Sequence, residues 1–157
     1  MQYTQGQLRN ATSISVETFR HWKTVLPYLA KKSGHAASFS EGDFLALLIL
    51  KKLSTDCSIK ISNLAEVFDE VLYICNTESW SALEKLALCV DLKSNSCRTA
   101  PLVEKFTISD VMIIISLATS VHELRDKLTL LQIEDSHKQS IATSYSHDAT
   151  SVLKGHA

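Results

Sequence analysis

The first quarter of the chain places apolar residues among polar ones at the spacing of helices. Leu8 and Ala11 lie three residues apart and mark the inner face of a short first helix. Ser15 has the small polar side chain preferred at a helix N-cap, and Val16 and Phe19 then recur as the apolar rear face of a second helix. The pattern predicts two short helices joined by a polar turn.

The chain changes character at Pro27. Proline disfavours the helical conformation of the residue before it, so the second helix is expected to end near Leu26. Residues 28–39 then hold a polar centre with one glycine between two short apolar pieces. This order predicts two extended pieces joined by a turn.

Two long apolar helices are expected next. Ser40 and Asp43 have the spacing of a capping box, and residues 44–53 are apolar on most sides of a helix, which predicts a buried central helix. The pattern breaks at residues 56–60. Apolar residues return at helical spacing over residues 61–75, and we expect this second helix to pack against the first.

A region of mixed helix and strand follows. A short helix is expected over residues 78–85, and the alternation of residues 86–92 predicts a strand that returns, after a turn, as residues 96–100. The isoleucine-rich residues 111–117 predict a strand buried on both faces.

The last part of the chain is expected to contain one more helix and a tail. Ser120 and Glu123 have capping-box spacing, and the apolar residues at positions 121, 124, 128 and 131 would line one side of the helix that follows. From Glu134 onward the sequence is polar and has no sustained apolar period. A disordered tail is therefore predicted.

Composition and charge narrow the class of protein. With 157 residues, 45% of them hydrophobic, the chain can bury a core as one domain or two small ones. Its longest apolar run is too short to span a bilayer and its N-terminus lacks the order of a signal peptide, so we expect a soluble cytoplasmic protein without a membrane partner. Residues 1–60 carry a net charge of +4 and residues 61–157 a net charge of −5. A polyanion would be attracted to the first part and repelled by the second.

The cysteines give little support for metal or catalytic chemistry. Cys57, Cys75, Cys89 and Cys97 include no C-x-x-C pair and no histidine at zinc-finger spacing, and we expect reduced, largely buried thiols. Cys89 or Cys97 with His122 would suit a thiol and base in an enzyme, but their spacing does not require it. The four glycines form no phosphate-binding loop. The prediction is a protein that is not an enzyme, with no catalytic residues, metal or cofactor.

The N-terminal residues also carry a distinctive order of polar and apolar types. Residues 3–8 read Tyr-Thr-Gln-Gly-Gln-Leu, and residues 14–22 read Ile-Ser-Val-Glu-Thr-Phe-Arg-His-Trp. Phe39, Ser40 and Asp43 then lead into the apolar helix. In these positions the chain resembles the DNA-binding domain of the MerR family of winged-helix transcription regulators. The resemblance covers about a third of the chain and includes polar positions that a core would not dictate.

The resemblance, joined to the pattern above, implies a mostly α protein in three parts. A winged helix-turn-helix domain would occupy residues 1–76, a small α+β dimerisation or interaction domain residues 77–132, and a disordered tail residues 133–157. The implied function is that of a sequence-specific transcription regulator that binds double-stranded DNA. A homodimer is expected, because one helix-turn-helix reads too few bases to be selective.

The resemblance also implies which side chains meet DNA. The recognition helix would span about residues 15–26 and the wing about residues 28–39, and the wing lysines would contact phosphates. The candidate residues on the helix are Glu17, Thr18, Arg20, His21, Trp22 and Lys23, and those on the wing are Lys31, Lys32 and His35.

Several of these residues have a structural interpretation as well. Trp22 is equally well explained as core packing, and Arg20 as an ordinary surface salt bridge, although DNA contact is favoured for Arg20. Arg9, Lys51 and Lys52 are interpreted as a solvated helix surface.

The chain also departs from the family. Ser13 stands where the family usually has glycine, and residues 36–38 lack its usual wing arginines. The alternative function is therefore a protein-interaction adaptor that keeps the fold, binds DNA weakly or not at all, and meets a protein partner through its acidic C-terminal region.

Overall fold

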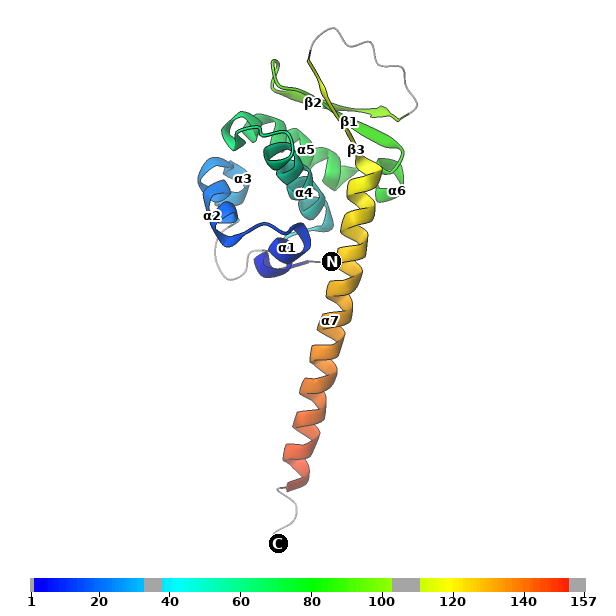
Figure 1. Cartoon of the computed structure of the whole chain (residues 1–157). Coiled ribbons are helices and arrows are strands. Elements are labelled where there is room, and N and C mark those ends of the chain that lie inside the picture. Colours follow the sequence, from blue (N-terminus) through cyan, green and yellow to red (C-terminus); the bar gives the residue numbers. More distant parts are fainter. Residues whose placement is uncertain (1, 33–37, 103–110, 153–157) are drawn as a thin grey trace. The chain divides into compact units, whose positions relative to one another are not determined.

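The computed structural model describes residues 2–32, 38–102 and 111–152. The chain is mostly helical, with a small three-stranded antiparallel sheet and a final helix (Figure 1). This agrees with the predicted mostly α fold with a few strands and a final helix. Residues 1–124 form one compact unit and residues 125–157 another, so both of the predicted domains lie mainly in the first unit. The elements are α1 (Gln5–Thr12), α2 (Val16–Val25), α3 (Pro27–Lys31), α4 (Glu41–Thr55), η1 (Ile61–Leu64), α5 (Ala65–Thr77), α6 (Trp80–Leu83), β1 (Leu86–Asp91), β2 (Ser96–Pro101), β3 (Ile113–Ser116) and α7 (Leu117–Val152).

Helices α1 and α2 form where the apolar spacing predicts them. Thr4 caps α1 in a capping box with Gln7, in which the Gln7 backbone N–H donates to Thr4 Oγ1 at 3.2 Å and the Thr4 N–H donates to Gln7 Oε1 at 2.8 Å. The predicted N-cap of α2 is confirmed, because Ser15 Oγ accepts a hydrogen bond from the Thr18 N–H at 3.1 Å. The helix ends at Val25, and its C-cap is Leu26, immediately before Pro27, as expected.

Helix α4 is the centre of the core. Its predicted capping box is present, with Ser40 and Asp43 bonded to each other's backbone, and every residue from position 42 to 50 is buried. The helix packs against both α1 and α5 (Figure 1). Neighbours on several sides explain why its sequence is apolar nearly all round instead of along one stripe.

The segment after Pro27 differs from the prediction. Residues Pro27–Lys31 form α3 in place of the first extended piece of the expected wing. Proline is well suited to the first turn of a helix, where its missing N–H has no partner to lose, so Pro27 ends α2 and begins α3. The second piece is extended at Phe39, whose backbone pairs with Tyr3 through two hydrogen bonds of 2.9 Å. His35 and the centre of the predicted wing lie outside the described residues.

The three strands are arranged in the order β2-β1-β3. The predicted hairpin of β1 and β2 is confirmed, with Leu86 opposite Pro101 and Asp91 opposite Ser96. β1 is the central strand, and its residues 87–90 are all buried. β3 is antiparallel to β1 at the edge and is only partly buried, so the prediction that this strand is buried on both faces is wrong. An apolar sequence alone does not distinguish a central strand from an edge strand.

The start of α7 also differs from the prediction. The helix begins at Leu117, so Ser120 lies inside it and is not an N-cap. Both residues of the predicted capping box contact Lys52 of α4. Lys52 Nζ donates to Ser120 Oγ at 3.1 Å and forms an ion pair with Glu123 Oε2 at 2.9 Å. These contacts tie the start of α7 to the central helix.

Residues 133–152, predicted as disordered, are part of α7, which continues to Val152. No glycine or proline interrupts residues 117–152, and the hydrogen bonds of a helix are local, so the helix does not depend on an apolar stripe for its backbone bonding. Residues 153–157 lie outside the described part. Among the described residues, no helix combines the length and apolar content needed to cross a bilayer.

Candidate nucleic-acid interface

The turn between α1 and α2 is fixed by backbone bonds and one buried side chain. Ser13 ends α1 in the left-handed conformation, with φ of 52°, and its N–H donates to the Asn10 carbonyl at 3.3 Å. Ile14 is buried, and its N–H donates to the Arg9 carbonyl at 3.1 Å. The left-handed backbone at Ser13 explains why glycine suits this position, since only glycine adopts it without steric cost. The turn holds the start of α2 in a defined direction.

Helix α2 has one buried and one exposed side. Phe19 and Leu26 are fully buried, whereas Val16, predicted to belong to the apolar rear, is 44% exposed. The prediction that Val16 is a core residue is wrong. Val16 is the first residue of the helix, one turn before Phe19, and lies next to the exposed N-cap. The candidate residues Glu17, Thr18, Arg20 and His21 are all exposed.

Trp22 and Lys23 are less accessible than the other candidates on α2. Trp22 is only 3% exposed, so its indole packs in the core and is not a direct DNA contact. Lys23 is half-buried, and its ammonium lies 5.8 Å from the centre of the Phe19 ring. The side chains able to reach a partner are therefore those on the solvent side of α2.

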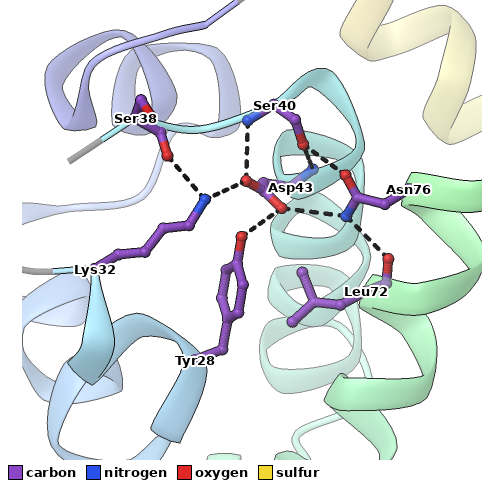
Figure 2. Close-up of polar contacts among 7 residues, drawn as sticks. All are labelled: Tyr28, Lys32, Ser38, Ser40, Asp43, Leu72 and Asn76. Carbon is purple, nitrogen blue, oxygen red and sulfur yellow. Dashed lines mark hydrogen bonds and ion pairs between the residues drawn. The ribbon is translucent and has the colours of Figure 1, made fainter.

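The two lysines of the predicted wing have different environments. Lys31 is exposed at the end of α3. Lys32 donates to Asp43 Oδ2 and to the Ser38 carbonyl, each at 2.8 Å (Figure 2). Its ammonium also lies 4.9 Å from the Tyr28 ring centre and 4.8 Å from that of Phe39. Because two of its three N–H donors and its charge are engaged by the protein, Lys32 is poorly placed to contact a phosphate, which corrects that assignment.

The carboxylate of Asp43 organises the network around Lys32. It also accepts hydrogen bonds from the Tyr28 hydroxyl at 2.7 Å, the Ser40 N–H at 2.9 Å and Asn76 Nδ2 at 3.2 Å (Figure 2). Burial alone would raise the pKa of this carboxyl, but the bonds from Lys32, Tyr28 and Ser40 outweigh it and lower the pKa below its usual value. Burial and Asp43 together raise the pKa of Tyr28. The network joins α3, α4 and α5 and has a structural role.

A groove of about 610 Å³ runs beside the exposed side of α2. From α2 it is lined by Glu17, Thr18 and His21 among others, and across from them lie Lys60 and Ser62 at the start of η1. Sequence reasoning did not select Lys60 or Ser62, because they are about forty residues from the motif. The polar break at residues 56–60 was the only signal in the sequence that this loop is exposed.

The other candidate cations are engaged with the protein or lie elsewhere. Lys51 donates to the Thr12 carbonyl at 3.1 Å, at the end of α1, and Lys52 is paired with Glu123 as described above. The sequence predicted that both lysines lie on a solvated helix surface. That prediction is wrong, because each contacts a residue of another helix. The Arg20 side chain has no ion pair or hydrogen bond with the described residues.

The cysteines and histidine considered for catalysis meet other partners. Of the two candidate thiols, Cys89 is buried in β1, and burial together with the Glu70 carboxylate raises the pKa of Cys97 to about 12. His122 Nε2 lies 3.4 Å from Glu84 Oε1. A thiol with a raised pKa is a poor nucleophile, so this geometry does not favour thiol chemistry. The described residues contain no cluster of histidine, cysteine or carboxylate side chains suited to a metal.

No protein-family model matches the chain, and comparisons with curated proteins and with solved structures give no match. The features that bear on function are therefore those of the described residues themselves. These are a capped helix α2 held by a short turn, an exposed side with Arg20 and His21, and a neighbouring groove that adds Lys60.

Proposed function

We propose that the chain is a sequence-specific DNA-binding transcription regulator whose recognition helix is α2, within a MerR-like helix-turn-helix. The observation that carries the proposal is the division of α2 into two sides. Phe19 and Trp22 anchor one side in the core, while Glu17, Arg20 and His21 stand exposed on the other. A helix of this construction can enter a major groove with its rear face fixed.

The chemistry of the exposed side suits DNA. The guanidinium of Arg20 can donate two parallel hydrogen bonds to guanine or to a phosphate, and it has no competing ion pair among the described residues. His21 adds a donor one residue further along the helix. The hydroxyl of Thr18 accepts a hydrogen bond from Ser15 Oγ at 2.9 Å, so Thr18 helps to fix the start of the helix while its exposed side chain remains near the groove. Arg20 is the residue expected to contribute most to binding.

Phosphate contacts would come from both sides of α2. Lys31 lies at the end of α3, and Lys60 lies across the groove from Glu17 and His21. The N-terminus of α2 adds the positive end of the helix dipole. In this proposal Lys60 takes part in the role first assigned to Lys32.

A binding selection tests the proposal. Random-sequence duplexes are enriched on the protein at low ionic strength and sequenced, and the enriched duplex is then titrated by fluorescence anisotropy. We expect a palindromic motif, and a loss of affinity of about tenfold or more for Arg20→Ala. Arg98→Ala, which removes an exposed arginine from β2, is the matched control and should bind like the parent protein. Failure to enrich any duplex, or equal binding by the Arg20→Ala protein, would contradict the proposal.

A specific observation also favours the second candidate, a protein-interaction adaptor. Lys32 is held in the Asp43 network, and Tyr73 is 70% exposed on α5 beside Asp69 and Glu70 in a shallow groove. An exposed tyrosine among acidic residues suits a basic protein surface. The adaptor predicts a stable protein complex that is unaffected by Arg20→Ala and disrupted by Tyr73→Ala.

A further inference from the structure

β3 lies at the edge of the sheet, and its described residues carry none of the charges or prolines that often protect an edge. Residues 111–116 read Val-Met-Ile-Ile-Ile-Ser, without charge, proline or glycine. The side chains of Val111 and Ile114 are 88% and 40% exposed. Natural sheets blunt a free edge with charged residues, proline, a bulge, a covering segment or a very short strand. β3 is short, with four residues, but it is uncharged and apolar, so its edge is suited to a pairing strand.

The direction of the β3 backbone follows from one hydrogen bond of β2. The Cys97 N–H donates to Glu70 Oε2 at 2.6 Å, so it points away from β1 and toward α5. Cys97 faces Val90, and backbone groups alternate along antiparallel strands, so the N–H and C=O of Val90 point to β3, where Ile113 is the partner. The N–H and C=O of the next residue, Ile114, therefore point out of the sheet.

The two edges of the sheet thus differ in how their backbone groups are used. At the β2 edge, Glu70 of α5 accepts the outward N–H of Cys97. At the β3 edge, the outward groups of Ile114 have no hydrogen bond within the part of the chain that the structure describes. A strand added beside β3 would satisfy them, as in β-augmentation.

We propose that β3 pairs in antiparallel with β3 of a second copy of the chain, about a two-fold axis at Ile114. Ile114 would then meet its own copy and exchange both backbone hydrogen bonds with it, and Met112 of each copy would pair in the same way with Ser116 of the other. The lack of charge on β3 also favours this occupant. An identical uncharged strand meets the edge without burying any charge, whereas a charged strand would bury one beside isoleucine.

This pairing supplies the two copies that a regulator needs to read two half-sites. The role of this dimer in DNA binding therefore rests on the proposed function. The interface itself rests on β3 alone and is measured without DNA. A protein that dimerises through β3 and binds no DNA would refute the proposed function only, and a monomer that binds single half-sites would refute the pairing only.

Charge variants at the axis test the pairing. Sedimentation or light scattering over a range of concentrations should show a dimer of the full chain. Ile114→Lys and Ile114→Glu each place two like charges opposite each other, and each should raise the dimer dissociation constant about tenfold or more. Mixing the two variants in equal amounts should restore a heterodimer, because position 114 then faces the opposite charge. Only a residue that meets its own copy has this property.

The matched control and a second measurement complete the test. Asn63→Lys, at an exposed position on η1, should leave the dimer unchanged. In the paired strands the two Ile114 Cα atoms would be about 5.5 Å apart, so Ile114→Cys should form an intermolecular disulfide on mild oxidation, while Asn63→Cys on η1 should not. A monomeric parent protein, unaltered dimers in both charge variants, or a mixture that fails to associate would overturn the proposal. Circular dichroism identifies any charge variant that is unfolded, and the disulfide result then decides.

Discussion

The backbone conformation of Ser13 gives a test of the turn that positions α2. A left-handed φ of 52° costs a serine about 1 kcal/mol relative to glycine, because its Cβ crowds the backbone. Ser13→Gly should therefore raise the free energy of unfolding by about 1 kcal/mol, measured by urea denaturation. Ser54→Gly, near the end of α4, should instead lower it by about 0.5 kcal/mol. A loss of stability in Ser13→Gly would show that the turn does not hold this conformation.

The buried carboxylate of Asp43 should make stability depend on pH. Its pKa is lower in the folded chain than its usual value of 3.8, so its contribution is fully present above pH 3.8 and is lost as the pH falls through the folded-state pKa. Asp43→Asn should lower the free energy of unfolding at neutral pH by about 3 kcal/mol, because Lys32 then loses its anionic partner in a half-buried site.

Denaturation at a series of pH values measures this effect. The difference between the parent protein and Asp43→Asn should shrink as the pH falls below about 4. Asp69→Asn, at an exposed position on α5, is the control and should change stability little at any pH. A gap that stays constant down to acid pH would mean that the carboxylate charge is not what stabilises the network.

At the scale of elements, Gly42 allows the close approach of α4 and α5. A Cβ at this position would lie 2.5 Å from Asn76 Oδ1 and 2.6 Å from the Cys75 carbonyl oxygen. Replacing a helical glycine by alanine usually stabilises a helix, but here the helices would have to separate. Gly42→Ala should lower the unfolding free energy by about 1–3 kcal/mol.

The second helical glycine is a direct control for this prediction. A Cβ on Gly6, in α1, would meet its nearest atom at 3.8 Å, which is ordinary contact. Gly6→Ala should therefore be neutral or stabilising by up to about 1 kcal/mol. Equal effects of the two substitutions in thermal or urea unfolding would be inconsistent with close packing at Gly42.

The elements that were predictable from sequence are those defined by local signals. The caps at Ser15 and Ser40, and the alternation of residues 86–92, depend on neighbours within a few positions, and α2, α4 and β1 follow from them. The edge position of β3 and the start of α7 at Leu117 depend on contacts with distant segments. Both were predicted wrongly because the apolar pattern does not say which neighbour covers a residue.

The same reasoning explains what was predictable in the candidate site. The exposure of Arg20 and His21 follows from their place on α2 opposite Phe19, which the helical period gives directly. The capture of Lys32 by Asp43 joins residues eleven positions apart through a turn that has no sequence signature. Lys60 reaches the groove beside α2 through the tertiary fold alone.

At the scale of the whole molecule, the uneven charge of the chain gives the last prediction. Residues 1–60 carry a net charge of +4 and include α2, Lys31 and Lys60, whereas residues 61–157 carry −5. If α2 seats on DNA, the affinity must fall with added salt, because each phosphate contact releases condensed counterions and adds about 0.9 to the slope of log affinity against log salt. Arg20→Ala should reduce this slope by about 0.9 if the guanidinium meets a phosphate. It should leave the slope unchanged while lowering affinity and relaxing sequence preference if the guanidinium meets a base.

The control for the slope is Arg98→Ala, which removes the same charge from the sheet. An identical decrease of the slope in Arg98→Ala and Arg20→Ala would show that net charge alone attracts DNA, without a defined orientation. A slope near zero in the parent protein would remove the electrostatic basis of the proposed function. Titrations of the enriched duplex at several salt concentrations distinguish these results, since a seated α2 requires the two variants to differ.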